Sequence, residues 1–427
     1  MRRPAPTMPA GQAGPPPPVV VVHPIHQHAY ETAAAADRAG LLRWFITGMY
    51  DTGRGAGNPD SWGWLPRPVG RAVRGRLRAR WHPEIDRGRV QTIVRYHALA
   101  AGARIGLAWL PPAGPHILSE WATRRFDSAV ARRLRRADHR GLVHAFEGGC
   151  IRTLEAAKRQ GIPTVLDVPS AHEYYLDTIE AEGGTVDRRM TATVRTERAL
   201  ADYLLAPSDY VVRCLVEHGV ERSKIVKIPY GVDTSRFLPR QAAEQDGHFR
   251  VLFVGSIGFR KGVHYLLEAW NRLRLPDASL ILAGPADAEG LRILRRHGGL
   301  RHWVGPVPRS EVQRWFGAAD LFVFPTLAEG FGLVYLEAMA AGLPVVTTPN
   351  SACVVRHGID GLVVQPRDVD ALCDALSLLH GQPDLRREMG ASGRRLIETS
   401  YTWQHYRDAL TSMYRAILGR QLIGALD

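Results

Sequence analysis

The segment from Leu321 to Thr348 constrains the fold more than any other part of this 427-residue chain. Its first residues, Leu321 to Pro325, form a short apolar run typical of a buried strand, and Leu333 to Ala341 are apolar on nearly every side. Gly330 and Gly332 lie between these runs, where glycine permits backbone angles that other residues avoid. The segment therefore predicts a buried strand, a tight turn, a buried helix and a further strand.

Two carboxylates stand in this segment where the apolar pattern does not favour them. Glu329 precedes the turn, and Glu337 follows inside the predicted helix. An unpaired buried carboxylate is costly or stays protonated, so each of the two needs partners. The amides of Phe331, Gly332 and Leu333 open a helix whose free N–H groups and dipole favour an anion. The alternative is that both carboxylates only brace the turn through hydrogen bonds to backbone amides.

Strand and helix patterns alternate regularly through the second half of the chain. Strands are expected at 251–254, 279–283, 302–304, 321–325, 344–348 and 361–365, and helices near 263–273, 289–297, 310–318, 333–341 and 369–380. Such alternation specifies an α/β fold with a parallel, doubly wound sheet, whose ligands lie beyond the carboxyl ends of the strands. A weaker rhythm at 19–22, 141–168 and 196–239 predicts a second domain, which the chain length also favours.

A glycine-rich turn follows the first of these strands, at the edge where ligands are expected. It runs from Gly255 to Gly262 and includes Gly258, Arg260 and Lys261. Glycine spacing alone fits a nicotinamide site about as well as a phosphate cradle. Lys261 favours phosphate, because only four of the 55 basic residues are lysine and a cation on such a turn can neutralise a diphosphate.

The residues E-G-F-G-L-V-Y-L-E at 329–337, followed by A-M-A-A-G-L-P-V-V, resemble the E-x7-E motif of family-four retaining glycosyltransferases. The resemblance implies two Rossmann-like, doubly wound domains that face a central cleft, the GT-B type. In that family the first Glu lies at the transferred sugar, and the second holds the ribose hydroxyls of a nucleotide-sugar donor. The implied site therefore has Glu329 as its catalytic carboxylate and a donor-binding set of Gly258, Arg260, Lys261, Phe331, Gly332, Leu333 and Glu337.

The same resemblance implies the activity and its partners. We expect transfer of a hexosyl or related unit from a nucleoside-diphosphate sugar to a glycan, lipid-linked or small-molecule acceptor, in cell-surface polysaccharide or glycoconjugate synthesis. The family generally works without a metal ion, so no metal or other cofactor is expected. A D-x-D pattern binds metal in other glycosyltransferases, but Asp368 and Asp370 are better interpreted as a helix N-cap and a first-turn acid.

Histidines supply further candidates close to the reacting groups. His172 comes after the strand predicted at 163–168, where relatives place a histidine near the reacting sugar carbon; a packed histidine bonded to backbone is the alternative. The H-x-x-H-x-H pattern that ends at His28 would suit a metal, but no Cys or acid cluster supports one. We expect His26, His28 and His144 on the acceptor side of the cleft, at the carboxyl edge of the first sheet.

Composition and resemblance together set the domain boundaries. Residues 1–18 are rich in Pro, Ala and Gly and are expected to be a disordered tail. Residues 19–235 are expected to bind the acceptor and residues 236–400 the donor, and a helix in 401–427 crosses back to the first domain in relatives. No run is long enough for a signal or membrane segment, and the four cysteines form no C-x-x-C, so a cytoplasmic protein is expected.

The net charge of +13 is concentrated in the first half, where residues 1–235 carry +10. Arginines dominate an acid-free run from Arg67 to Arg80 and crowd a predicted helix from Arg124 to Arg140. One interpretation is a solvated face. The other is attraction to an anionic lipid surface, which would hold the protein at the inner face of the cytoplasmic membrane, or to a phosphorylated acceptor. The excess of arginine over lysine looks like coding bias, so no nucleic-acid partner is expected.

Two alternative functions stay open at this point. A sugar-nucleotide epimerase or a phosphorylase uses the same pair of Rossmann-like domains with other chemistry. A non-catalytic, basic protein that binds polyanions or membranes would keep the fold and lose the need for Glu329 and Glu337. The E-x7-E pattern and the domain architecture both favour the transferase.

Overall fold

The computed structural model describes residues 18–24, 28–48, 50, 81–93, 96, 113–137, 139–184, 186, 188–239, 247–351 and 354–424. The predicted positions Arg67–Arg80 and His26 lie outside these residues. Within them, no helix combines the length and the apolar character that a membrane span requires.

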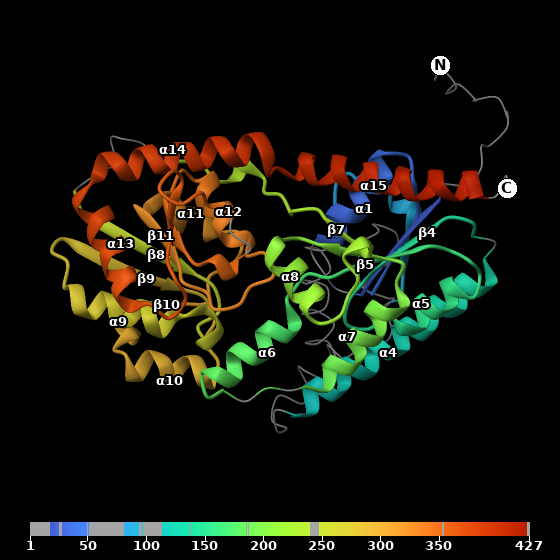
Figure 1. The fold of residues 1–427 in the computed structure, drawn as a ribbon, viewed down its shortest axis with the longest axis horizontal. Coiled ribbons are helices and arrows are strands. Elements are labelled where there is room, and N and C mark those ends of the chain that lie inside the picture. The colour runs from blue at the N-terminus through green and yellow to red at the C-terminus, as the bar shows by residue number, and fades with distance from the viewer. Residues whose placement is uncertain are drawn as a thin grey trace, which may run out of the picture. The chain divides into compact units, whose positions relative to one another are not determined.

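The first sheet has seven strands in the order β3-β2-β1-β4-β5-β6-β7 (Figure 1). They are β1 (Val19–His23), β2 (Leu42–Thr47), β3 (Val90–Thr92), β4 (Leu142–Phe146), β5 (Thr164–Asp167), β6 (Tyr203–Ala206) and β7 (Ile225–Lys227). Each strand pair whose register is described is parallel. All five residues of β1 are buried, as expected for a strand covered on both faces.

The second sheet has six parallel strands in the order β10-β9-β8-β11-β12-β13. They are β8 (Phe249–Val254), β9 (Ala278–Ala283), β10 (Trp303–Gly305), β11 (Leu321–Phe324), β12 (Val345–Thr347) and β13 (Gly361–Val363). The strand order reverses between β8 and β11, so the loops that follow these two strands diverge at a topological switch point, where ligands bind in such sheets.

Helices alternate with the strands and cover both sheets. They are α1 (His28–Arg38), α4 (Ala113–Arg136), α5 (Ile151–Lys158), α6 (His172–Ala181), α7 (Arg189–Leu200), α8 (Asp209–Glu217), α9 (Val263–Leu273), α10 (Ala288–Arg296), α11 (Val312–Ala318), α12 (Leu333–Ala340), α13 (Val369–Gly381), α14 (Pro383–Ser400) and α15 (Trp403–Gly424). Around the second sheet, α9 packs beside α13 and α12 beside α14 (Figure 1).

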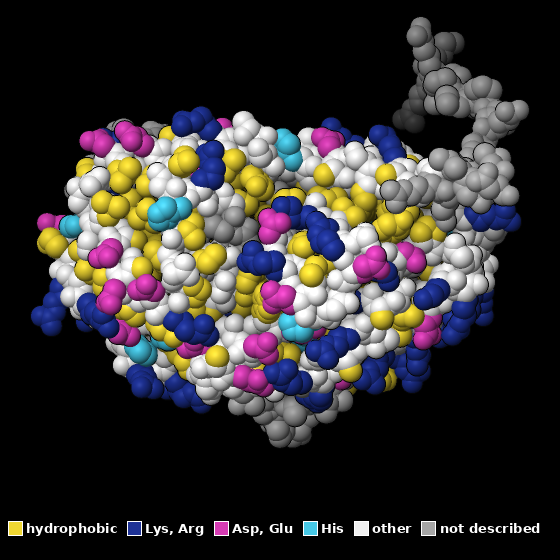
Figure 2. All heavy atoms as spheres, viewed as in Figure 1, with side chains coloured by type: hydrophobic (Ala, Val, Ile, Leu, Met, Phe, Trp, Pro, Cys, Tyr) yellow, Lys and Arg dark blue, Asp and Glu magenta, His cyan; other side chains and the backbone are white. Residues whose placement is uncertain are grey.

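Helix α4 shows how one helix can serve both the core and the surface. Its inner side packs on the first sheet in a cluster that includes Val20, Val22, Ile46, Phe126, Val130, Leu134 and Val143. Its outer side carries exposed arginines at 124, 125, 132, 133, 135 and 136. Basic side chains accordingly gather at the lower right of Figure 2, over α4. The helix is therefore amphipathic, with a core face that is apolar and a solvent face that is almost purely basic.

The chain forms two compact units. One comprises residues 1–145, 152–164 and 416–427, and the other comprises residues 146–151 and 165–415. The second unit holds β5, β6 and β7 together with the whole six-stranded sheet, so the contacts do not divide the chain at residue 235. The boundary between residues 235 and 236 stays a prediction.

The α/β class, the parallel doubly wound sheets and the positions of the elements in the second half are confirmed. Predicted strands and helices there agree with the structure to within about two residues. The interpretation of Asp368 as an N-cap is also confirmed, because its carboxylate accepts a hydrogen bond of 2.8 Å from the amide of Ala371.

Candidate active site

Two loops at the switch point of the second sheet build the candidate site. The first leads from β8 through a short 3-10 helix, Phe259–Lys261, into α9, and the second joins β11 to α12. The carbonyl of Arg260 accepts hydrogen bonds from the hydroxyl of Thr326 (3.1 Å) and the amide of Leu327 (2.8 Å). These bonds fasten the second loop to the first, so side chains from both loops keep a fixed separation.

Two glycines allow the close packing of these loops. Gly262 has a φ of +65°, and a Cβ there would lie 2.0 Å from the carbonyl oxygen of Pro325. At Gly330 a Cβ would lie 1.8 Å from the carbonyl oxygen of Pro169, in the loop between β5 and α6. A larger residue at either position would force the loops apart. The hydroxyl of Ser208 also donates to the carbonyl of Gly330 at 2.7 Å.

The carboxylate of Glu329 is held by two cations. Its Oε2 atom accepts hydrogen bonds from Lys261 Nζ and, at 3.0 Å, from Arg260 Nη1. The side chains of Glu329 and Lys261 are only 15% and 11% exposed. Arg260 also donates to the carbonyl of Ala328 at 3.0 Å. The pair of cations facing one carboxylate leaves a local excess of positive charge.

Aromatic rings shield these cations from water. Lys261 Nζ lies 4.7 Å from the ring centre of Phe324, and the guanidinium of Arg260 lies 5.2 Å from the ring centre of Tyr175. Burial and the charge of Arg260 both lower the pKa of Lys261, while the ion pair with Glu329 favours its charged form. Charges placed in such a setting interact strongly with an anionic ligand, since little solvent screens them.

A cavity of about 230 Å³ opens beside these groups. Its lining comes from the two loops of the second sheet, from the loop between β5 and α6, and from the start of α6: Ser170, Ala171, His172, Tyr175, Arg260, Ala328, Glu329 and Gly330. The structure thus brings His172 and Glu329, which are far apart in sequence, to one cavity. His172 Nε2 lies 3.1 Å from the hydroxyl oxygen of Thr191, and burial lowers the pKa of the imidazole.

Helix α6 is anchored at both ends. Near its start, Glu173 accepts hydrogen bonds of 2.8 and 2.9 Å from the buried Arg198. Just beyond its last residue, Glu182 binds Arg367 Nε at 2.7 Å and His264 Nε2 at 3.1 Å. These contacts fix the helix that carries His172, so the imidazole keeps its place in the cavity wall.

Glu337 lies on α12, where its side chain is only 4% exposed and forms an ion pair with Arg309 at 2.6 Å. Burial raises the pKa of Glu337, and the charge of Arg309 opposes that shift. The partner that the buried carboxylate needed is therefore Arg309, which is about half exposed.

The amides at the start of α12 have no side-chain cap. Gly332, which precedes the helix, has a φ of +72°, and the side chain of Phe331 is buried against Tyr230 with ring centres 5.2 Å apart. Gly258, by contrast, has an extended backbone that any residue adopts. In the turn from Gly255 to Gly262, the backbone conformation therefore requires glycine at position 262 but not at position 258. Contacts of Phe331, Gly332, Leu333 and Gly258 with a donor stay predictions.

The histidines expected on the acceptor side are far less exposed than an acceptor contact would suggest. His28 is the first residue of α1 and is buried, and His144 lies in the middle of β4 with 0% of its surface exposed. Strand β4 continues to Phe146, so His144 does not mark its carboxyl end. A role for either histidine at the acceptor stays a prediction, and the full burial of His144 argues against it.

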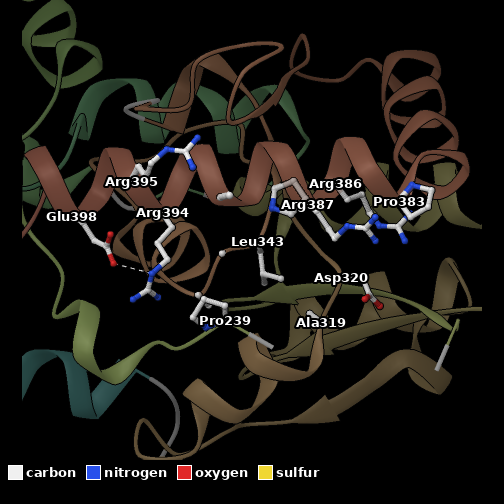
Figure 3. Close-up of a pocket in the computed structure, with 14 residues that line it drawn as sticks. Pro239, Ala319, Asp320, Leu343, Pro383, Arg386, Arg387, Arg394, Arg395 and Glu398 are labelled. Carbon is white, nitrogen blue, oxygen red and sulfur yellow. Dashed lines mark ion pairs between the residues drawn. The ribbon is translucent and has the colours of Figure 1, made fainter. Parts of the chain in front are cut away.

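A larger cavity, of about 450 Å³, lies along α14 (Figure 3). Figure 3 shows four arginines of that helix beside Leu343 and Pro239. Arg386 and Arg394 donate to the backbone carbonyls of His380 (3.0 Å) and Phe237 (2.9 Å), which makes them structural. The smaller cavity is lined by Glu329, Arg260 and His172, whose side chains can take part in a reaction. The larger volume of the other cavity therefore does not identify the active site.

Tyr175 and Arg309 are among the residues of the site that were not predicted from the sequence. Tyr175 follows His172 by one helical turn, so helical periodicity would have placed both on one face. Arg309 lies in a loop with no recognisable pattern, and only the need of Glu337 for a partner pointed to such a cation.

Family models match two parts of the chain. The model described as "Glycosyl transferases group 1" matches residues 248–382, and the model described as "Glycosyltransferase Family 4" matches residues 83–236. The two models meet near the predicted domain boundary, and together they cover more than half of the chain.

Curated relatives carry related names. Glycogen synthase of Mycobacterium tuberculosis (strain CDC 1551 / Oshkosh) is 28% identical over a match that covers 58% of this chain and 64% of the relative. D-inositol 3-phosphate glycosyltransferase of Pseudarthrobacter chlorophenolicus is 33% identical, covering 49% of this chain and 54% of the relative. The chain thus spans about half to two thirds of the length of the curated relatives that it matches.

Solved structures share the fold. Sucrose-phosphate synthase from Thermosynechococcus elongatus superposes with a TM-score of 0.67 at 19% identity, covering 96% of this chain and 99% of that one. Anabaena HepE, solved in complex with UDP and glucose, superposes with a TM-score of 0.62 at 15% identity, covering 93% and 99%. The predicted GT-B fold is confirmed by these likenesses. Together, the adjacent matches of both family models show the family: the chain belongs to the group 1, family 4 glycosyltransferases.

Proposed function

We propose that the protein is a retaining glycosyltransferase that moves a sugar from a nucleoside-diphosphate donor to a glycan, lipid-linked or small-molecule acceptor. The observation that carries the proposal is the arrangement of Lys261, Arg260 and Glu329 beside one cavity, with His172 in its wall. The family supports a transferase, and a structural relative was solved with UDP and glucose.

Lys261 and Arg260 form the proposed subsite for the diphosphate. They lie on a turn at the carboxyl end of β8, next to the start of α12, whose uncapped amides add positive potential. The carboxylate of Glu329 already binds both cations. A diphosphate therefore has to displace this carboxylate in order to bind them. The released carboxylate then lies close to the sugar, where it can accept hydrogen bonds from sugar hydroxyls.

Glu337 and Arg309 form the proposed subsite for the ribose. A carboxylate with several lone pairs can accept hydrogen bonds from two neighbouring hydroxyls. The ion pair with Arg309 favours the charged form of Glu337 and opposes the effect of its burial, and the exposed guanidinium can move aside when a ribose binds. This arrangement accounts for the second carboxylate of the motif without a structural role in the turn.

The chemistry follows from charge stabilisation in a shielded site. The bond between the anomeric carbon and the diphosphate oxygen breaks, and its electron pair leaves on the oxygen, which Lys261 and Arg260 stabilise. The acceptor oxygen bonds to the same face of the anomeric carbon, and its proton passes to the leaving diphosphate. These two cations supply the stabilising charge, so we propose no metal ion in the reaction and no nucleophilic role for Glu329.

We propose that the product belongs to a cell-surface polysaccharide or glycoconjugate and that the donor is used on the cytoplasmic side. The relatives bear the names of glycogen, inositol-phosphate and sucrose-phosphate enzymes, so they support several acceptor classes. The donor is therefore the part of the proposal to test first.

A thermal-shift screen of the full-length protein against nucleoside-diphosphate sugars tests the donor assignment. We expect at least one nucleotide sugar to raise the melting temperature, and its nucleoside monophosphate to raise it less because Lys261 and Arg260 then lack part of their ligand. The shift should be reduced in Lys261→Met, whose side chain keeps the volume and loses the charge. Equal shifts for wild type and Lys261→Met would contradict the proposed diphosphate subsite.

A further inference from the structure

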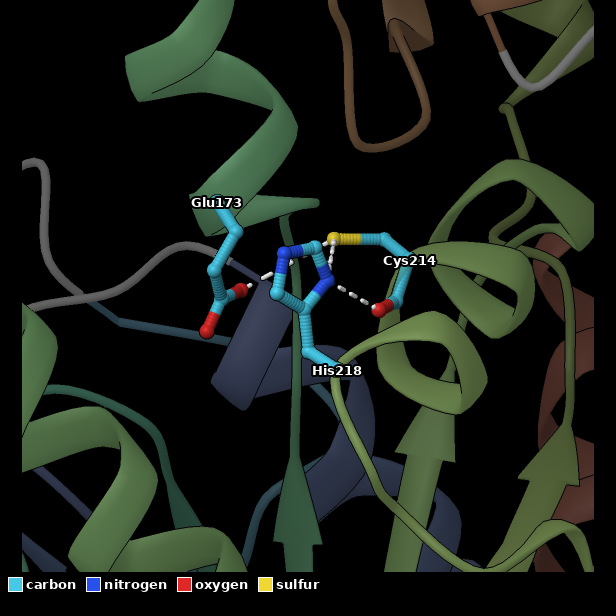
Figure 4. Close-up of side chains that lie close together, drawn as sticks. All are labelled: Glu173, Cys214 and His218. Carbon is cyan, nitrogen blue, oxygen red and sulfur yellow. Dashed lines mark hydrogen bonds between the residues drawn. The ribbon is translucent and has the colours of Figure 1, made fainter.

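Three side chains with metal-binding atoms meet between the start of α6 and the end of α8 (Figure 4). They are Glu173, Cys214 and His218. Cys214 Sγ lies 3.7 Å from Glu173 Oε2 and 3.9 Å from His218 Nδ1. All three ligand atoms lie within 4.8 Å of one another. Figure 4 shows the sulfur pointing toward both other side chains, so the cluster converges on one point.

We propose that Glu173, Cys214 and His218 bind one zinc ion. Zinc bonds are about 2.3 Å long to sulfur and about 2.0–2.1 Å to nitrogen or carboxylate oxygen. Around a tetrahedral ion these lengths separate the sulfur from each other ligand by about 3.6 Å. The observed separations of 3.7 and 3.9 Å are therefore close to those of a formed site.

The protons balance in a simple way. Zinc takes the place of the thiol proton that Cys214 now directs at Glu173, and this proton leaves to solvent. His218 Nδ1 lies 2.7 Å from the carbonyl oxygen of Cys214, so zinc binding requires the imidazole to turn from this carbonyl and to carry its proton on Nε2. His218 is exposed, which leaves it free to make that movement and gives the ion a path from solvent.

The carboxylate of Glu173 can hold a cation in addition to its arginine partners. Arg198, which is 3% exposed, lies between two buried carboxylates, those of Glu147 and Glu173. Arg195 Nε, on an exposed side chain, also lies 3.6 Å from Glu173 Oε1, and zinc with a thiolate would add one positive charge to this cluster. Arg198 bonds Glu173 through Nη1 alone, and a carboxylate has about four lone-pair positions, so both cations can be held.

The ligand types select the ion. Thiolate and imidazole favour zinc over magnesium or calcium, which prefer oxygen ligands. The described residues supply three ligands, so water would complete the tetrahedron. An ion here would tie α6 to α8 one residue away from His172, which lines the candidate active-site cavity. Its role is therefore structural, and it is separate from the proposed transfer chemistry.

Cobalt binding to the full-length protein tests the site. After EDTA treatment and buffer exchange, Co²⁺ should bind with a stoichiometry of one and give a thiolate-to-cobalt charge-transfer band with tetrahedral visible bands. Cys214→Ser should lose the charge-transfer band, and His218→Gln should weaken binding by at least about tenfold. Cys373→Ser is the matched control, since Cys373 lies on α13 and has no part in the cluster; its spectrum should equal that of the wild type.

Zinc-dependent stability gives a second readout that does not depend on activity. Zinc in excess over its dissociation constant should raise the melting temperature of the wild type and of Cys373→Ser, because the ion binds only the folded state. Cys214→Ser and His218→Gln should show little or no rise. The proposal is overturned if the wild type binds no stoichiometric cobalt, or if Cys214→Ser retains the charge-transfer band.

Discussion

Lys261 and Glu329 form an ion pair that is largely shielded from water, although they come from loops on two neighbouring strands. Arg260 Nη1 lies 3.0 Å from the same carboxylate oxygen. The first carboxylate of the E-x7-E motif thus binds the two cations that we propose as the binding partners of the donor diphosphate. Donor binding is then an exchange of one anion for another, and this exchange has measurable consequences.

Replacing Glu329 by Gln should tighten the binding of a nucleoside diphosphate while it slows sugar transfer. The amide has no charge to compete for Lys261, so the diphosphate displaces a weaker partner. We expect a gain of about 1 kcal/mol, roughly fivefold in affinity. Calorimetry with the nucleoside diphosphate measures the affinity. A loss of affinity in Glu329→Gln, with the protein still folded, would contradict the exchange.

Replacing Glu337 by Gln should weaken nucleotide-sugar binding by about 1–3 kcal/mol, the usual scale for hydrogen bonds to a charged group. The change keeps the volume and removes the charge that pairs with Arg309. Glu311→Gln is a suitable control, since that exposed glutamate precedes α11 and lies outside the proposed subsites. Equal donor affinity in both variants would remove Glu337 from the donor site.

Deprotonation of Glu147 should lower the free energy of unfolding as the pH rises. Burial raises the pKa of Glu147 from 4.5 to about 7, against the opposing effect of Arg198. Between these values the folded state binds more protons than the unfolded state, so this group lowers the free energy of unfolding by up to about 1.4 kcal/mol per pH unit. Glu147→Gln lacks this titration.

Urea unfolding at pH 5, 6 and 7 in the presence of EDTA measures the effect. The wild type should lose stability relative to Glu147→Gln over this range. Parallel pH profiles for the two proteins would show that Glu147 titrates normally in the folded state.

The basic outer side of α4 should bind anionic membranes. Its exposed arginines lie along one helix, where basic side chains gather in Figure 2, and a surface potential offers about 1 kcal/mol for each well-placed arginine. The protein should co-sediment with anionic but not with neutral vesicles, and less so at high salt because exposed charges are screened. A variant with Arg132, Arg133, Arg135 and Arg136 changed to Gln should bind less. Equal sedimentation with both vesicle types would show that these arginines form a solvated face and do not bind the membrane.

The second half of the chain could be predicted closely because its strands are short apolar runs between helices of clear periodicity. The run at Leu321 and the helix at Leu333 lie where the pattern placed them. The glycine turn and the two carboxylates could also be recognised, because their residue types conflict with an apolar setting and therefore demand an explanation.

Other features depend on contacts that no local pattern carries. The ion pair between Arg309 and Glu337 joins a loop to a helix, and Tyr175 reaches Arg260 from another part of the chain. His144 was expected at the carboxyl edge of the first sheet, but β4 runs on to Phe146, and the side chain of His144 is fully buried. The cluster at Cys214 was missed because Glu173 lies 41 residues away and only the packing of two helices brings it there.

The stereochemistry of the transferred sugar tests the central claim most directly. Full-length protein should be incubated with the nucleotide sugar that gives the largest thermal shift and with a panel of acceptors, and the anomeric proton of the new product should be followed by NMR. The account predicts a product with the same anomeric configuration as the donor, formed far more slowly by Lys261→Met and Glu337→Gln. An inverted product, or a product formed equally fast by both variants, would contradict it.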